Sequence, residues 1–341
     1  MHPLSTLTLA AGALALAAMA APQATAEASG AAAQGRSGRR AAPQLFPIVV
    51  EDRWGFVDRE GKMVANPQFD EAGAFFEGMA SVKLARRWGY VDAAGKLAIN
   101  PQFESAGDFS EGLAWVEAND RFGYVDKTGT FAINPQFDKV SAHSGGLAAV
   151  KLGGRWGYVD REGKFAINPQ FDNAGPFSDG LARVELDDRW GWVDEHGKLA
   201  ITPQFERAGE FEDGLAPVRL GDRWGFVDRK GTLAINLQFD EAASFLAGLA
   251  RVRIGDRWGY IDRKGTLAIN PQFDKAGDFH EGLAFAAIKD RFGFIDESGR
   301  LAINPQFDEA WDFHGGLARV KLERAHGYVD KTGTYVYNPT K

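Results

Sequence analysis

Cysteine is absent from this chain of 341 residues. Its absence excludes disulfide bonds, thiolate metal sites, a cysteine nucleophile and a lipid anchor on an N-terminal cysteine. An excess of positive charge is also lacking, since the formal net charge is -7. An acidic protein of this kind lacks the excess of positive charge that attracts the phosphates of nucleic acid, so we expect no nucleic-acid partner.

Lys and Arg are missing from the N-terminal region, where residues 4–20 form an apolar stretch softened by Ser, Thr and Ala. Ala24-Thr25-Ala26 then supplies a small-x-small cleavage site before Glu27, so residues 1–26 are predicted to be a signal peptide. An uncleaved anchor is the alternative, but an Ala-rich run is a poor membrane span, and no stable span is expected after cleavage. We therefore expect a periplasmic or secreted protein, with residues 27–43 as a disordered Ala/Gly/Arg linker.

Internal repetition is the strongest signal in the sequence. A glycine that follows an aromatic ring in eight of nine copies recurs every 34 residues without an insertion. The pattern divides residues 44–341 into nine repeats, of which the last has His326 in place of the ring. These glycines are Gly55, Gly89, Gly123, Gly157, Gly191, Gly225, Gly259, Gly293 and Gly327.

The residues inside the period decide the fold class. Helical hairpins can also repeat every 34 residues, but a copy such as GLAWVEANDRFGYVDKTGTFAINPQF has Gly or Pro every few residues and no apolar stripe at helical spacing. Short alternating segments fit instead, with strands at GLAxVxL, WGYVD and LAINPQF. Each repeat is therefore predicted to be a three-stranded antiparallel meander in an all-β array.

Two recurrent features connect the strands. A D-x-x-G motif occurs in every copy, with Asp expected to cap a turn and Gly to adopt the left-handed conformation that closes it. Stacked turn aspartates could alternatively hold Ca²⁺, although the turn explains the pattern without a metal. One Phe recurs in the polar loop between meanders, with His143 replacing it once, and we expect it to pack as a wedge between neighbouring meanders.

The segment RWGYVDxxGKLAINPQFDxAGxFxEGLAxV closely resembles the WG repeat, also called the KWG repeat, which is found in many bacterial proteins. The resemblance extends from residue 45 to about residue 339. It implies a β-rich array with a binding or structural role. It implies no known reaction and brings no catalytic residues.

The arrangement of the nine meanders has two solutions. The favoured one is an open β-superhelix, or solenoid. With three strands per sheet, the chain leaves each sheet at the end opposite to the one where it entered. In addition, propellers usually have four-stranded blades and eight or fewer of them. The alternative is a propeller-like closed ring in which the first and last meanders meet.

Binding residues are sought where equivalent positions differ. The central position of GLAxVxL varies among otherwise fixed neighbours and carries Trp, Phe and Arg, the side chains that anchor protein interfaces. Trp311 stands where most other copies have Gly. The candidate binding surface therefore consists of Trp115, Arg183, Arg251, Phe285, Trp311 and Arg319.

The remaining recurrent polar side chains have plainer explanations. The Arg before each ring could line an anion-binding groove, but we expect it to stack on an aromatic ring or pair with an acid. His280 and His314 occupy equivalent positions in neighbouring copies and could bind a metal weakly, although chance placement is preferred.

The sequence contains no G-x-S-x-G, no H-E-x-x-H and no phosphate-binding glycine loop. We therefore expect no enzyme, no cofactor and no metal. The expected function is that of a scaffold of the cell envelope that binds another protein. The alternative is a module that binds cell-wall glycan through exposed aromatic rings.

Overall fold

The computed structural model describes residues 44–340. Every regular element in this part of the chain is a β-strand, which confirms the all-β prediction. Within this range the structure contains no helix able to cross a bilayer. The predicted signal peptide and linker, residues 1–43, lie outside the described residues.

The strands form nine antiparallel sheets, numbered here in chain order. Sheet 1 comprises β1 (Phe46–Val50), β2 (Arg53–Val57) and β3 (Met63–Phe69). Sheets 2–9 have four strands each. Their first strands are β4 (Glu71–Phe76), β8 (Ser105–Ala106), β12 (Lys139–Val140), β16 (Asn173–Ser178), β20 (Arg207–Ala208), β24 (Glu241–Ala242), β28 (Lys275–Ala276) and β32 (Glu309–His314).

The second and third strands correspond to the predicted GLAxVxL and WGYVD segments. The second strands are β5 (Met79–Leu84), β9 (Ala114–Ala118), β13 (Ala148–Leu152), β17 (Leu181–Leu186), β21 (Leu215–Leu220), β25 (Leu249–Ile254), β29 (Leu283–Ile288) and β33 (Leu317–Leu322). The third strands are β6 (Arg87–Asp92), β10 (Arg121–Val125), β14 (Arg155–Val159), β18 (Arg189–Asp194), β22 (Arg223–Asp228), β26 (Arg257–Asp262), β30 (Arg291–Asp296) and β34 (Ala325–Asp330).

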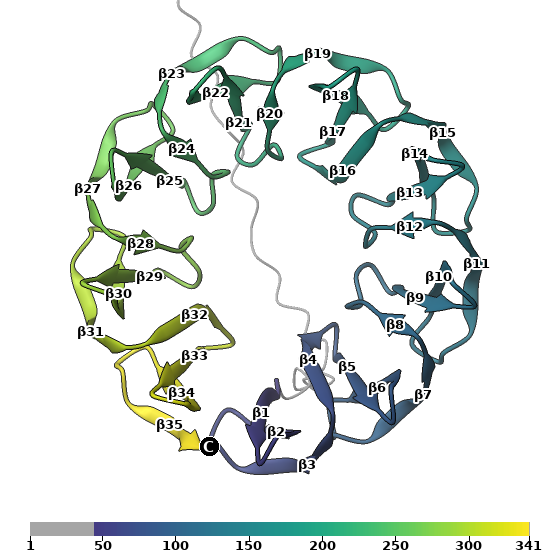
Figure 1. Cartoon of the computed structure of the whole chain (residues 1–341), viewed down its shortest axis with the longest axis vertical. Coiled ribbons are helices and arrows are strands. Elements are labelled where there is room, and N and C mark those ends of the chain that lie inside the picture. The colour runs from purple at the N-terminus through teal and green to yellow at the C-terminus, as the bar shows by residue number, and fades with distance from the viewer. Residues whose placement is uncertain (1–43, 341) are drawn as a thin grey trace, which may run out of the picture. The chain divides into compact units, whose positions relative to one another are not determined.

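The fourth strands correspond to LAINPQF and lie along the rim of the molecule (Figure 1). They are β7 (Leu97–Phe103), β11 (Phe131–Phe137), β15 (Phe165–Phe171), β19 (Leu199–Phe205), β23 (Leu233–Phe239), β27 (Leu267–Phe273), β31 (Leu301–Phe307) and β35 (Tyr335–Thr340). We call these eight, together with β3, the rim strands.

The nine sheets follow one another around a closed ring, and the hairpins between first and second strands point toward its axis (Figure 1). This arrangement is a nine-bladed β-propeller. The favoured prediction of an open superhelix is therefore wrong, and the alternative closed ring is the fold that the structure has. The prediction of three strands per unit holds for sheet 1 alone, because the other sheets have four.

The error has a physical origin in the segment between meanders. That segment, predicted to be a loop, forms the first strand of the next sheet, and five of these eight first strands are only two residues long. The rim strand β3 ends at Phe69 and β4 begins at Glu71. The rim strand itself leads the chain to the next sheet (Figure 1), so no long return connection is required.

The glycine that defines the repeat has a steric role. The pairing of β6 with β7 shifts register between Trp88 and Tyr90, which marks a bulge. A Cβ atom on Gly89 would lie 2.4 Å from the carbonyl oxygen of Ile99 and 2.7 Å from the nitrogen of Pro101. Only glycine therefore allows the rim strand to cross its neighbour so closely.

The D-x-x-G turns form as predicted. Asp92 Oδ1 accepts hydrogen bonds from the backbone N–H groups of Ala94 at 2.9 Å and Lys96 at 3.0 Å. Gly95 donates its N–H to the Asp92 carbonyl oxygen and has a φ of 74°. The carboxylate thus caps the turn, and glycine supplies its left-handed residue.

The recurrent Phe is the predicted wedge between neighbouring sheets. Phe109, just after β8, is buried, and its ring meets that of Tyr90 in the preceding sheet at 4.9 Å between centroids. His143 takes the same place in sheet 4 and packs on Tyr124 at 4.6 Å. These contacts join one core cluster to the next around the ring.

Sheets 1 and 9 close the ring at a seam. The ring of Phe46 in β1 packs on Tyr328 in β34 at 5.4 Å, and the Tyr328 hydroxyl donates to the Pro47 carbonyl oxygen at 2.8 Å. Gly61 lies against the carbonyl of Val336 in β35. Sheet 9 therefore contacts sheet 1 through core residues, as other neighbouring sheets do.

Candidate functional site

The variable position of the second strand points into the space between neighbouring sheets. Five of the six candidate residues occupy it, and all five are half-buried. They are Trp115, Arg183, Arg251, Phe285 and Arg319. The sixth, Trp311 in β32, has 37% of its surface exposed. The candidates therefore line a series of grooves between sheets, and their role in binding stays a prediction.

The groove between sheets 3 and 4 is aromatic. Trp115 packs on Phe122 with ring centroids 5.8 Å apart, and Trp156 of the next sheet lines the same groove. Together with Val140 they line a cavity of about 260 Å³. The indole lies directly on the backbone of Gly107, where a Cβ atom would be 2.0 Å from Trp115 Nε1.

Phe285 repeats this packing between sheets 8 and 9. Its ring lies 5.9 Å from that of Phe292, and a Cβ atom on Gly277 would be 2.4 Å from Phe285 Cε1. A large aromatic ring at this position therefore depends on the glycine that directly follows the adjacent first strand.

Arg183 and Arg251 fill equivalent grooves through identical sets of contacts. Arg183 stacks on Trp190 at 5.0 Å, forms an ion pair with Glu210 at 2.9 Å between Nε and Oε1, and donates to the Ala208 carbonyl oxygen. Arg251 stacks on Trp258 at 5.5 Å and has Asp278 and Ala276 in the corresponding roles. In both cases the acid and the carbonyl come from the next sheet.

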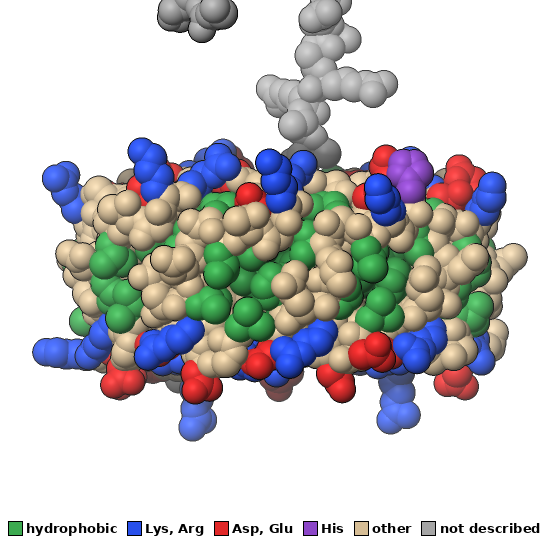
Figure 2. All heavy atoms as spheres, turned by 90° about the horizontal axis from the view of Figure 1, so that it is seen from above, with side chains coloured by type: hydrophobic (Ala, Val, Ile, Leu, Met, Phe, Trp, Pro, Cys, Tyr) green, Lys and Arg blue, Asp and Glu red, His purple; other side chains and the backbone are tan. Residues whose placement is uncertain are grey.

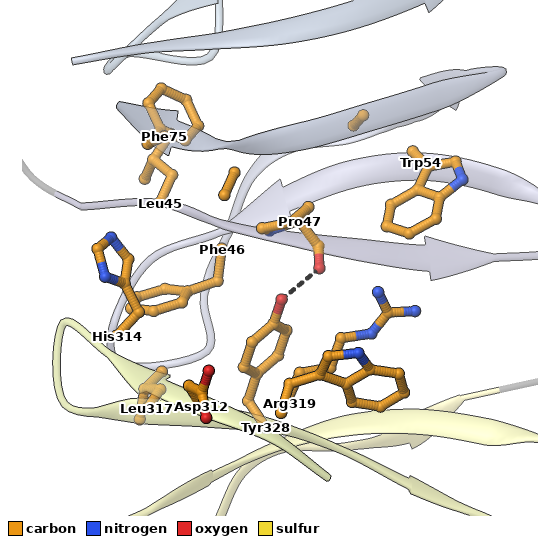
Figure 3. Close-up of a pocket in the computed structure, with 13 residues that line it drawn as sticks. Leu45, Phe46, Pro47, Trp54, Phe75, Asp312, His314, Leu317, Arg319 and Tyr328 are labelled. Carbon is orange, nitrogen blue, oxygen red and sulfur yellow. Dashed lines mark hydrogen bonds between the residues drawn. The ribbon is translucent and has the colours of Figure 1, made fainter. Parts of the chain in front are cut away.

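The groove at the seam differs from these. Arg319 lies between two indole rings, with its guanidinium carbon 5.2 Å from the centroid of Trp54 and 4.9 Å from that of Trp311. Figure 3 shows it beside a pocket of about 240 Å³. Burial lowers the pKa of Arg319 from its ordinary value. Other lining residues include Leu45, Phe46, Phe75, Asp312, His314 and Leu317.

The Arg before each aromatic residue of the repeat forms an ion pair with the acid that follows the rim strand of its own sheet. This ion pair is one of the two explanations expected from the sequence. Arg223 and Asp240 are 2.5 Å apart, Arg87 and Glu104 are 3.3 Å apart, and Arg53 pairs with Asp70. The side chains remain about half exposed, so each pair contributes little to stability.

The histidines and aspartates considered as metal ligands have other contacts. His280 Nε2 lies 3.5 Å from Asp312 Oδ2, and the His314 ring lies 6.1 Å from that of Phe76. The turn aspartates direct their oxygens at backbone N–H groups. No cluster of three or more His, Asp or Glu suited to a metal occurs among residues 44–340.

A ladder of contacts at the hairpin tips near the axis was not predicted from the sequence. Glu77 accepts the backbone N–H of Gly112 in the next tip at 3.0 Å and pairs with Lys127 at 3.1 Å. Burial opposes ionisation, but these two donors hold the pKa of Glu77 below its ordinary value. Glu281 forms the same pair with Lys331 at 3.2 Å.

Two columns of the repeat carry the signal for this ladder. Where the tip has no acid, at Gly145 and Ala247, the position that holds the base elsewhere is an acid, Glu195 and Glu297 respectively. A third tip without an acid, Gly315, departs from this pattern, because the corresponding position across the seam is the base Arg59. The pairs therefore vary together at two of the three tips of sheets 2–9 that lack an acid.

The closed ring of four-stranded sheets places the chain among β-propellers, and comparison with solved structures supports this. A structure described as the eukaryotic initiation factor superposes with a TM-score of 0.64 at 8% identity, covering 87% of this chain and 96% of that chain. Dihydro-heme d1 dehydrogenase NirN gives 0.48 at 12% identity, covering 78% and 73%. The first likeness, at 8% identity, concerns the fold alone, and nothing is argued from the second. No curated protein matches the chain significantly.

The family model of the WG containing repeat matches eight consecutive segments between residues 54 and 323. These matches cover most of the chain, so the protein belongs to the WG containing repeat family. The resemblance based on the Trp-Gly dipeptide and its neighbours is thereby confirmed.

Proposed function

We propose that this propeller is an exported, non-catalytic scaffold that binds another protein of the cell envelope through the grooves between its sheets. The observation that carries the proposal is the aromatic groove formed by Trp115, Phe122 and Trp156, together with its counterpart at the seam. Half-buried Trp and Arg side chains held in rigid positions are the groups that anchor protein interfaces.

The rim supplies a second apolar surface. Each rim strand begins with an apolar residue, and most of these are among the more exposed side chains, such as Leu97 at 43% and Leu301 at 45%. Figure 2 shows apolar side chains in a band around the rim, between charged side chains on the two faces. Exposed apolar bands of this kind favour a role in association.

Capture from envelope extract, followed by reconstitution with the purified partner, tests this function. The double variant Trp115→Ala/Trp311→Ala is compared with His196→Gln, at an exposed turn away from both surfaces, as the control. We expect the groove variant to weaken partner binding at least about tenfold, because truncation of anchor residues typically costs this much. Unchanged affinity of the groove variant contradicts the proposal.

Glycan binding is a second candidate, favoured because Trp115 and Trp156 line the same cavity and a sugar can stack on an indole face. Titration with soluble cell-wall glycan fragments, monitored by Trp fluorescence, separates the two. Saturable quenching that is lost in Trp115→Ala supports the glycan, whereas a flat titration leaves the protein partner.

A further inference from the structure

The grooves at Arg183 and Arg251 are filled from within the chain, whereas the equivalent groove at the seam holds an open pocket. We propose that this pocket binds a carboxylate side chain of a partner protein, and that Arg319 is the residue that holds it. This inference rests on the proposed function and names the chemistry of the partner.

The two internal copies define the ligand. Arg251 takes one oxygen from Asp278 at 3.0 Å and one from the carbonyl of Ala276 at 2.7 Å. Arg183 takes the same two groups from Glu210 and Ala208. Both acids follow an Ala-Gly pair. The guanidinium in this groove therefore recognises a small-Gly-acid segment in an extended conformation.

At Arg319 the groove contains the guanidinium but no counterpart of the acid that pairs with it in the two internal copies. Unlike its two counterparts, it makes no ion pair or hydrogen bond with any of residues 44–340, and its guanidinium stacks on Trp54 and Trp311. The acid whose charge acts on it, Glu309, is already paired with Lys321 at 2.6 Å. Asp312 lines the same pocket but lies beside His280, at 3.5 Å. A guanidinium held between two rings presents its N–H edge to an incoming carboxylate.

The chain's own N-terminal segment is a poor occupant on charge. Counting back by whole repeats, the position that carries Glu210 and Asp278 is occupied by Arg40, and Arg36 and Arg39 precede it. A second cation beside Arg319 would be repelled. Charge complementarity therefore favours an acidic segment supplied by another protein.

The pocket also limits the size of the residue that can follow the acid in the bound segment. Its volume of about 240 Å³ is enclosed by Leu45, Phe75 and Leu317 beside the polar edge of Arg319. Phe46 already fills the place that the wedge Phe takes elsewhere, since its ring packs on Tyr328 at 5.4 Å. A fitting segment therefore has a small residue after the acid, where Phe279 follows Asp278 in the internal copy.

The test uses the full chain and the capped peptide Lys-Ala-Gly-Asp-Ala, which copies residues 275–278 and ends in Ala. Binding is titrated by ligand-observed NMR, with the same peptide carrying Asn in place of Asp as the matched probe. We expect saturable binding of the acidic peptide with a Kd near or below about 1 mM, and binding at least about tenfold weaker for the Asn peptide.

Two variants assign the site. Arg319→Gln is expected to remove binding, whereas Arg223→Gln, which changes an exposed ion pair outside the grooves, is expected to retain it. Peptide comparison on the unchanged protein keeps the test valid if a variant fails to fold. Failure of the acidic peptide to bind, equal binding of the Asn peptide, or retained binding by folded Arg319→Gln each overturns the proposal.

The same variant separates this inference from the proposed function. If Arg319→Gln leaves capture of the envelope partner intact while Trp115→Ala abolishes it, the scaffold function stands and the assignment of the seam pocket is wrong. If both variants lose the partner and the peptide binds only through Arg319, the two proposals stand together.

Discussion

The ring of Phe46 meets the ring of Tyr328 edge-on, with centroids 5.4 Å apart, and so joins the first strand of the propeller to its last sheet. Position 46 is Ala in the other eight copies, such as Ala80 and Ala318. In those copies the wedge Phe of a first strand fills the space between sheets. Phe46 supplies the aromatic ring at the seam from the second-strand position instead.

Substitution of Phe46 should therefore open the seam. Phe46→Ala is expected to lower the free energy of unfolding by about 3–4 kcal/mol, because a buried ring is lost and a cavity remains. Urea titration measures the effect, with Leu199→Ala, at an exposed position on the rim, as control. A loss below about 1 kcal/mol would show that Phe46 does not hold the ring closed.

The repeat glycine should be intolerant of any side chain. In Gly157→Ala the new Cβ atom would lie 2.5 Å from the Ile167 carbonyl oxygen, so the rim strand must move, at a cost of at least about 1–3 kcal/mol. Gly180 has a φ of 73° and open space around its Cβ position. Gly180→Asn should therefore cost much less, and equal melting temperatures for the two variants would contradict the steric explanation.

His143 should make stability fall in acid. Burial lowers the pKa of this imidazole below its ordinary value of 6.5 in the folded protein. Below about pH 6.5 the unfolded chain therefore takes up a proton that the folded chain resists, and stability declines as the pH falls toward the folded pKa. In His143→Phe the loss between pH 8 and pH 5 should be smaller, measured by urea unfolding at each pH. The exposed His196→Gln should behave like the unchanged protein.

It should be possible to add one more ion pair to the ladder at the hairpin tips. Gly145→Asp with Glu195→Lys rebuilds the acid and base that Glu77 and Lys127 provide elsewhere. We expect the double variant to gain about 0.5 kcal/mol more than the two single variants together, since the new pair is partly exposed. Additive effects in a double-mutant cycle would mean that the covariation has another cause.

Local features of this fold could be predicted from sequence because each depends on a few neighbouring residues. The turn at Asp92, the buried wedge at Phe109 and the pairing of Arg87 with Glu104 all follow from patterns within one repeat. Because the repeats have nearly the same sequence, the same local structure recurs in each of them.

Ring closure could not be predicted in this way, because it depends on contacts between the two ends of the chain. The two-residue strands such as β8 give no periodic signal, and the rim strands show no sign in sequence that they run along the circumference. The candidate residues were found because they vary. Their half-buried position between sheets depends on the three-dimensional structure. The absence of a paired acid at Arg319 could likewise be seen only in the structure, which brings Trp54 and Trp311 together around it.

The most direct test of the closed ring is a crosslink across the seam, and the absence of native cysteine makes it clean. The rings of Phe76 and His314 lie 6.1 Å apart although they belong to sheets 2 and 9. Phe76→Cys with His314→Cys should therefore be joined rapidly by a short bismaleimide within one chain, shifting its mobility on a denaturing gel. The pair Phe76→Cys with Glu212→Cys, on opposite sides of the ring (Figure 1), should not. Equal, slow reaction of both pairs in the folded protein would contradict the closed ring.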